Sequence, residues 1–116
     1  MSVTYVIDFN VRPGCTERFR TLIDKVLDSM RHEANFRNAA LHQDPDDPHH
    51  FLLYESWADH QDVLEVQLER PYRAEWHAAL PEILSKPRGI SIWKPLRADG
   101  AFAQTECKPA MLGEEA

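Results

Sequence analysis

The apolar residues near the start of the chain change from a period of two to a period of three and four, and this change constrains the fold most strongly. From Val3 to Val11 every second residue is apolar, which predicts a β-strand with one buried face, and Pro13-Gly14 marks its end. From Thr16 the apolar side chains recur three or four positions apart, which predicts an amphipathic helix, and they are Phe19, Leu22, Ile23, Val26, Leu27 and Met30. The chain is therefore expected to open with a strand followed by a helix.

Two further strands joined by a tight turn are predicted after this helix. Residues 35–41 have the pattern of a more polar strand, and residues 49–57 that of a third strand with apolar residues on both faces. Between them lies Asp44-Pro45-Asp46-Asp47-Pro48, in which Asp side chains can bond nearby backbone groups and proline fixes φ. This arrangement predicts a hairpin.

A divided helical region and a last strand complete the expected domain. Asp59 is suited to cap a helix, and Pro71 suits the first turn of a second helix better than the interior of the first. The second helix has one apolar side, made of Tyr72, Trp76, Leu80, Ile83 and Leu84. Residues 88–96 alternate around Ile90 and Ile92 and predict a final strand, whereas residues 97–116 show no period and are expected to form a C-terminal tail.

The order of these elements predicts the fold class. Strand, helix, strand, strand, helices, strand is the split βαβ order of a ferredoxin-like α+β fold, in which right-handed crossovers place the helices on one face of a four-stranded antiparallel sheet. The first and third strands, central in this topology, carry apolar residues on both faces, so the open face is expected to pack on another sheet. We therefore predict one domain over residues 1–96, a homodimer through the sheet face, and a small-molecule cavity between sheet and helices.

Length and composition exclude several classes of protein. A chain of 116 residues fits one domain, and 43% hydrophobic with 28% charged residues is typical of a soluble globular protein. The net charge of −6 argues against a nucleic-acid partner, and no apolar run approaches the ~20 residues of a membrane span or the ~7 of a signal-peptide core. Two distant cysteines, Cys15 and Cys107, argue against a disulfide framework, so we expect a reduced, cytoplasmic protein.

The segment Phe51-Leu52-Leu53-Tyr54-Glu55-Ser56-Trp57 carries a resemblance to a known family. With its Tyr-Glu-x-Trp pattern, the hairpin before it and the divided helix after it, the chain resembles the antibiotic biosynthesis monooxygenase domain over roughly residues 3–96. This family of dimeric α/β barrels includes oxygenases that oxidise quinols and polyketides with O₂ and without metal or flavin, together with haem-degrading relatives and members of unknown activity. The resemblance therefore implies a homodimer that takes a small aromatic substrate and O₂ and needs no cofactor.

The chain departs from both branches of this family at the positions of their site residues. The histidine pair of many quinol oxygenase-like members falls here on Gln67 and Tyr72. The axial histidine of the haem-degrading relatives is matched by His77, but their cavity tryptophan and strand asparagine have no counterpart. Haem binding through His77 therefore stays open as an alternative.

Oxygenation without a cofactor requires a base, because the anion left when a phenolic or enolic proton is removed can pass an electron to O₂. Histidine suits this task, since its reference pKa of ~6.5 lies near the operating pH. His77 lies beside Trp76, at the edge of the apolar side of its helix, and we predict it as the catalytic base. The alternative is that His77 is a helix-boundary residue bonded to a neighbour.

Six side chains around the predicted cavity are expected to bind the substrate, namely Leu53, Glu55, Trp57, Tyr72, Arg73 and Trp76. Glu55 shares a strand face with Leu53 and Trp57, where an unpaired carboxylate would be costly to bury, so it needs a partner, an interface or a wet cavity. An arginine across the dimer is the favoured partner. Arg73 either orients an anionic substrate or pairs with Glu69, and the tryptophans either form the cavity wall or belong to the core or the dimer interface.

No metal site is predicted. His49 and His50 are adjacent on a strand and so point to opposite faces, and the run from Asp44 to Asp47 lacks the glycine and distal glutamate of a calcium loop. His32 and His60 are placed at helix ends and receive no catalytic role.

Three functions from different classes remain. The leading hypothesis is a cofactor-independent monooxygenase that oxidises a quinol, phenol or similar enolisable aromatic with O₂. The second is a non-catalytic binding or stress-response module that holds a hydrophobic metabolite in the same cavity, which the missing histidine pair favours. The third is haem binding through His77.

Overall fold

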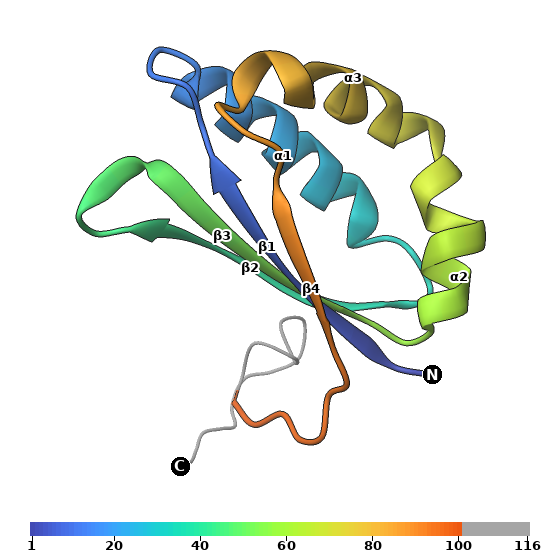
Figure 1. The fold of residues 1–116 in the computed structure, drawn as a ribbon. Helices are drawn as coiled ribbons and strands as arrows, with labels where there is room; N and C mark the ends of the chain where they lie inside the picture. Colours follow the sequence, from blue (N-terminus) through green and yellow to red (C-terminus); the bar gives the residue numbers. More distant parts are fainter. Residues whose placement is uncertain (101–116) are drawn as a thin grey trace.

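The computed structural model describes residues 1–100, and the predicted tail from position 101 onward lies outside the described residues (Figure 1). A four-stranded antiparallel sheet, in the order β2-β3-β1-β4, carries its helices on one face (Figure 1). The elements are β1 (Val3–Asn10), α1 (Thr16–Met30), β2 (Phe36–Asp44), β3 (Asp47–Trp57), α2 (His60–Glu65), the short 3₁₀ helices η1 (Gln67–Glu69) and η2 (Pro71–Arg73), α3 (Ala74–Ile83) and β4 (Gly89–Trp93). The predicted α+β, ferredoxin-like fold is confirmed.

The two central strands of the sheet are β1 and β3, as the order of the elements predicted. β1 pairs with β3 from Val3 opposite Trp57 to Asn10 opposite His50, and with β4 on its other side. The covered face of β1 carries every second residue from Val3 to Phe9, and all of these are buried. This register sets the covered face of β3 directly beside them, so that both strands form the floor under the helices.

The hairpin between β2 and β3 is confirmed, but its strands extend further than the predicted residues 35–41 and 49–57. Asp44 lies opposite Asp47, and the backbone N–H of Asp46 donates to Asp44 Oδ1 at 2.8 Å, which closes the turn tightly. Both strands therefore continue almost to the turn. β4 is shorter than the predicted 88–96, because it ends at Trp93 shortly before Pro95, which has no N–H for a ladder.

The helical layer after β3 begins after Asp59 and divides at Pro71, as the sequence predicted. The side chain of Asp59 accepts a hydrogen bond from the backbone N–H of Gln61 at 3.2 Å, so α2 starts immediately after it. Pro71 begins the separate turn η2, which leads into α3. No helix among residues 1–100 has the length and apolar character needed to cross a membrane.

An aromatic cluster joins the sheet to the helices. The ring of Phe9 lies 5.1 Å from that of Phe19 on α1 and 5.7 Å from that of Trp76 on α3, and Phe19 lies 4.8 Å from Phe51 on β3. Edge-to-face and tilted contacts at these separations stabilise a core beyond the area that they bury. The cluster therefore fixes both long helices over the same end of the sheet.

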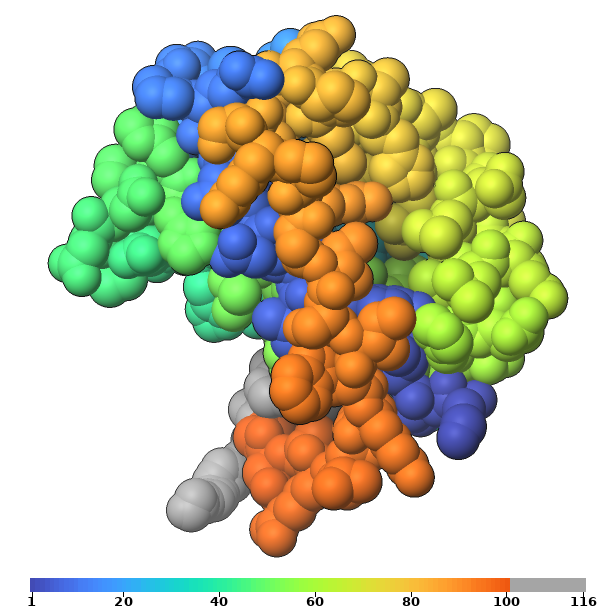
Figure 2. All heavy atoms as spheres, in the orientation of Figure 1, coloured from blue at the N-terminus to red at the C-terminus, as the bar shows by residue number. Residues whose placement is uncertain are grey.

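β4 is an edge strand that is exposed along its whole length. Figure 2 shows it in orange, running across the face of the molecule in this view. The side chains of Ile90, Ile92 and Trp93 are half exposed or more. Trp93 pairs with Thr4 and so belongs to the open face of the sheet, whereas Ile92 pairs with Tyr5 on the covered face.

The open face of the sheet carries an ionic cluster centred on His50. Its Nδ1 lies 3.0 Å from Asp44 Oδ2 and its Nε2 lies 2.5 Å from Asp8 Oδ1, so that the imidazolium form donates to both carboxylates. The bonds to Asp44 and then to Asp8 raise the pKa of His50 above its ordinary value, while the bond to His50 lowers the pKa of Asp44. The cluster thus connects β1, β2 and β3 across the face that the helices leave open.

Replacing Asp8 with Asn is expected to lower the pKa of His50, because the charged acceptor at Nε2 is lost. Since the folded pKa lies above the unfolded value of ~6.5, this pair stabilises the fold below that pH, and the stabilisation disappears as the pH rises through the folded pKa. A histidine-detected NMR titration of wild type and Asp8→Asn measures the change. Asp46→Asn, at an exposed carboxylate of the same turn, serves as the control, and an unchanged midpoint in Asp8→Asn would contradict the geometry.

Candidate functional site

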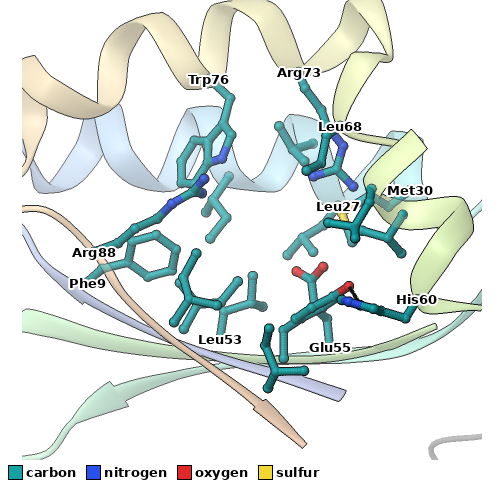
Figure 3. A pocket seen from close by; sticks show the side chains of 18 residues that line it. Phe9, Leu27, Met30, Leu53, Glu55, His60, Leu68, Arg73, Trp76 and Arg88 are labelled. Carbon is teal, nitrogen blue, oxygen red and sulfur yellow. Dashed lines mark hydrogen bonds between the residues drawn. The ribbon is translucent and has the colours of Figure 1, made fainter. Parts of the chain in front are cut away.

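A cavity of about 230 Å³ lies between the covered face of the sheet and the helices, where a small-molecule site was predicted (Figure 3). Its wall is mainly apolar and includes Ile7 and Leu53 from the sheet, Val26 from α1 and Trp76 from α3. Five polar side chains interrupt this wall, and they are Tyr5, Glu55, His60, Arg73 and Arg88. A dry cavity with a few inward polar groups is the usual form of a small-molecule site.

The carboxylate of Glu55 rises from the floor of the cavity (Figure 3). Glu55 is 6% exposed, and the indole Nε1–H of Trp57, two residues further along β3, donates to its Oε1 at 2.8 Å. Burial raises the pKa of Glu55 above its ordinary value, and this outweighs the bond from Trp57 and the positive charges of Arg73 and Arg88, which act in the opposite direction. The side chain is thus a buried carboxyl group with a fixed orientation and an unusually high proton affinity.

Two guanidinium groups reach the cavity from different sides, Arg73 from the helical layer above the sheet and Arg88 from the segment before the edge strand β4 (Figure 3). Arg73, on η2, is 6% exposed, and its Cζ lies 5.8 Å from the ring centre of Trp57 and 5.7 Å from that of Tyr72. Arg88 precedes β4. Its pKa is lowered mainly by burial and also by the charge of Arg73, while the charge of Glu55 acts to raise it. Arg73 therefore lies inside the fold, and among the described residues it forms no ion pair with Glu69, the surface partner considered from the sequence.

A tyrosine and a histidine form a hydrogen-bonded pair at one end of the cavity. Tyr5, on the covered face of β1, has its hydroxyl 2.7 Å from Nδ1 of His60, the first residue of α2. Burial raises the pKa of Tyr5, and the neighbouring charge of Glu55 adds to this effect. Figure 3 shows His60 near Glu55, and the charge of Glu55 acts on Tyr5, so three ionisable side chains share this end of the cavity.

Four of the predicted site residues are brought together in this cavity, and they are Leu53, Glu55, Arg73 and Trp76. Trp57 and Tyr72 are not among the lining residues. Trp57 is 0% exposed and contacts the cavity through its bond to Glu55. The hydroxyl of Tyr72 donates to Glu33 Oε2 at 3.1 Å. These two aromatic residues instead support the cavity from outside, since the guanidinium of Arg73 packs near both rings.

The structure places His77 outside the cavity, in a second hollow with Arg12, Ser85 and Lys86 that has Arg88 in common with the cavity. Trp76 is 4% exposed and points inward, and the next residue on a helix is turned about 100° away from it. Burial, followed by the charges of Arg88 and Arg73, lowers the pKa of His77. His77 therefore does not line the cavity that holds Leu53, Glu55, Arg73 and Trp76, and its roles as a base or a haem ligand stay predictions.

Three side chains that line the cavity were not predicted from the sequence, namely Tyr5, His60 and Arg88. The parity of Tyr5, which shares its strand face with the apolar residues of β1, could have identified it. His60 and Arg88 have no such signal, because the first lies at a helix start and the second in a loop before an edge strand. Within residues 1–100, no group of three or more His, Cys, Asp or Glu side chains is arranged to hold a metal ion.

Comparison with known proteins identifies the family. The sequence pattern described as antibiotic biosynthesis monooxygenase matches residues 2–84, which is most of the chain. The chain belongs to this family.

Two curated proteins have related sequences. An uncharacterised protein of Synechocystis is 26% identical over 87 residues, which cover 75% of this chain but only 58% of that protein. A Pestalotiopsis microspora protein, named as a candidate monooxygenase, is 29% identical over 93 residues, covering 79% of this chain and 78% of its own length. This chain therefore spans little more than half the length of the first of these relatives.

Solved structures of other proteins share the fold. Rv0793 from Mycobacterium tuberculosis superimposes with a TM-score of 0.77 at 22% identity, and the match covers 86% of this chain and 100% of that chain. SnoaB, a cofactor-independent oxygenase from Streptomyces nogalater, superimposes with a TM-score of 0.72 at 18% identity, covering 84% of this chain and 95% of that one. These similarities establish the architecture of this antibiotic biosynthesis monooxygenase domain.

Glu55→Gln is expected to change how the stability of the protein depends on pH. Because the folded pKa of Glu55 lies above its unfolded value, wild type gains stability from this group at low pH and loses it as the pH rises through the folded pKa. Glutamine cannot ionise, so the free energy of unfolding of Glu55→Gln should increase relative to that of wild type as the pH rises from about 4. Urea unfolding across this range measures the difference.

Glu17→Gln is the matched control for this experiment, because Glu17 is an exposed carboxylate in the first turn of α1. Its unfolding free energy should not increase relative to that of wild type as the pH rises. Parallel curves for wild type and Glu55→Gln would show that the Glu55 carboxyl is not held in a desolvated site.

Proposed function

We propose that this family member is a cofactor-independent monooxygenase that oxidises a quinol, phenol or similar enolisable aromatic with O₂. The observation that carries the proposal is the apolar cavity into which a buried carboxyl group and two guanidinium groups point (Figure 3). The family supports it, and so do the names of two relatives, a cofactor-independent oxygenase and a candidate monooxygenase.

Glu55 is the base in this proposal. Its carboxyl lies inside the cavity, and its raised pKa brings its proton affinity closer to that of a phenol, which makes proton transfer less unfavourable. The bond from Trp57 occupies Oε1 and leaves Oε2 for the substrate hydroxyl. His77 was the base predicted from the sequence, and it keeps that role only if a substrate reaches the second hollow.

The remaining groups stabilise the anion and the intermediates that follow. The guanidinium of Arg88 faces the cavity and favours a phenolate over a phenol, and the hydroxyl of Tyr5, bonded to His60, can donate to a second substrate oxygen. The apolar wall keeps water away from radical and peroxide species. These groups bind and position, while the electrons come from the substrate itself.

The reaction balances without an added reductant. For a dihydroxynaphthalene, one atom of O₂ enters the ring to give a hydroxynaphthoquinone and the other leaves as water. The substrate loses two hydrogens and gains one oxygen, which is a four-electron oxidation that matches the four electrons accepted by O₂. A simple oxidase would instead give the naphthoquinone and hydrogen peroxide, so the products distinguish the two reactions.

The test is oxygen uptake by metal-free protein supplied with dihydroxynaphthalene. We expect uptake above the rate without protein, a hydroxynaphthoquinone that contains one labelled oxygen from ¹⁸O₂, and a loss of at least ~100-fold in Glu55→Gln. Activity of wild type should rise with pH through the elevated pKa of Glu55, since the base acts when ionised.

His77→Ala is the comparison variant for this assay. A large loss in His77→Ala with full activity in Glu55→Gln would return the catalytic role to His77. Saturable binding of the aromatic with no oxygen consumed would favour the alternative of a non-catalytic binding module.

We also propose that the protein is a homodimer joined through the open faces of its sheets. Trp93 is 59% exposed and Leu52 is 36% exposed on that face, and a second sheet packed on it would cover both side chains. Sedimentation at micromolar concentration should give twice the chain mass of 13.4 kDa, and Trp93→Asp should shift it toward the monomer. Arg20→Asp, on the exposed side of α1, is the control, and a monomeric wild type would contradict the proposal.

A further inference from the structure

The cavity holds more positive charge than its own carboxyl group can balance. Arg73 and Arg88 both line it, and Glu55 is the single acidic side chain among the lining residues. Burial raises the pKa of Glu55, so this carboxyl also loses its negative charge more readily than an exposed one. The chain as a whole has a net charge of −6, so a cationic cavity is a local feature and not a consequence of composition.

Arg73 is the more deeply buried of the two arginines, and part of its guanidinium has no hydrogen-bond partner. Its Nε and Nη2 are fully enclosed and have no hydrogen-bond partner. Surface arginines of the same chain do find carboxylates, as Arg18 does with Glu82 at 2.9 Å and Arg70 with Glu33 at 3.1 Å. A buried guanidinium without an acceptor is unfavourable, which indicates that an acceptor from outside the chain completes it.

The two unpartnered atoms also specify the shape of that acceptor. Nε and Nη2 lie on the same edge of the planar guanidinium, and their N–H groups are parallel donors that match the two oxygens of a carboxylate. The rings of Trp57 and Tyr72, with centres 5.8 and 5.7 Å from Cζ, restrict the orientation of this edge. Figure 3 shows the guanidinium directed into the cavity.

We infer that the substrate is an aromatic carboxylic acid. Its carboxylate binds side-on to Nε and Nη2 of Arg73, once the guanidinium turns this enclosed edge toward the cavity, while its ring occupies the apolar part of the cavity. The inference deepens the proposed function and rests on it for the aromatic ring. An apolar cavity of about 150 Å³ accepts benzene. The 230 Å³ observed here therefore suits a ring system somewhat larger than benzene, between Leu53 and Trp76.

Arg73 and Glu55 then have separate tasks. The carboxylate on Arg73 sets the position of the ring, and the phenolic hydroxyl to be deprotonated is presented to Glu55, with Arg88 facing the anion that forms. A substrate without the carboxylate would leave Arg73 unpaired in the bound state, so the same contact provides selectivity as well as affinity.

The test uses ligands that cannot be oxygenated, so that binding is measured apart from catalysis. Naphthalene-carboxylate and naphthalene-carboxamide have the same ring and nearly the same shape, and they differ in charge. Titration by calorimetry at pH 7 should show that wild type binds the carboxylate at least ~10-fold more tightly than the carboxamide. Arg73→Gln should remove this preference and leave the affinity for the carboxamide within ~3-fold of wild type.

The matched control is Arg12→Gln, which removes one positive charge from an exposed position in the other hollow. It should keep the full preference for the carboxylate. Arg73→Lys retains the charge without the side-on pair of donors and should recover only part of the preference. If Arg73→Gln binds neither ligand, a preference restored by Arg73→Lys supports the inference, and loss of both ligands in both variants overturns it.

Equal affinity of wild type for the two ligands would overturn the inference, and so would a preference that survives in Arg73→Gln. Each failure is distinct from failure of the oxygenase proposal. Oxygen uptake with a neutral dihydroxynaphthalene, together with equal binding of naphthalene-carboxylate and naphthalene-carboxamide, would leave the oxygenase standing without an acid substrate. Binding of the carboxylate that depends on Arg73, with no oxygen consumed by any dihydroxynaphthalene or its carboxylate, would leave the ligand class standing without the oxygenase.

Discussion

A carboxyl group on the covered face of the central strands is the constraint on which the site depends. Apolar side chains cannot simply close over Glu55, because a buried ionisable group needs hydrogen bonds and compensating charge. Trp57 supplies the bond at 2.8 Å, and Arg73 and Arg88 supply the charge. The packing around these groups leaves a cavity of about 230 Å³ where a continuous core would otherwise lie. The core is therefore divided into a packed aromatic end and an open polar end.

Different helical elements cover the two ends of this divided core. At the packed end, Phe9, Phe19 and Trp76 connect β1 to both long helices. At the open end the helical layer consists of short pieces, α2, η1 and η2, which carry His60 and Arg73 to the cavity. Short segments can direct side chains from several angles, which one continuous helix with a single apolar stripe cannot do. The proline at the start of η2 thus helps to place Arg73 at the cavity.

Electrostatics connects the site to the chemistry proposed for it. Low polarity raises the proton affinity of the carboxyl group, and the nearby cations limit that rise while favouring anionic ligands. A base and an anion site in the same apolar cavity is the combination required to generate a reactive aromatic anion away from water. The chain lacks the histidine pair usual for quinol oxygenase-like relatives, since Gln67 and Tyr72 stand at those positions, and Tyr72 binds Glu33 instead. A carboxyl base offers a different route to the same ionisation.

The sequence by itself determined the elements, their order and the residues of their buried faces, because a period of two or of 3.6 depends only on local backbone geometry. It also marked Glu55 as exceptional, since a carboxylate at an apolar position conflicts with that pattern. The tertiary structure alone decided which way His77 faces, and it alone brought Tyr5 to His60 and Arg73 to Glu55. These contacts join residues from separate elements, and the angle at which each helix meets the sheet depends on the packing of the whole core, which no local pattern encodes.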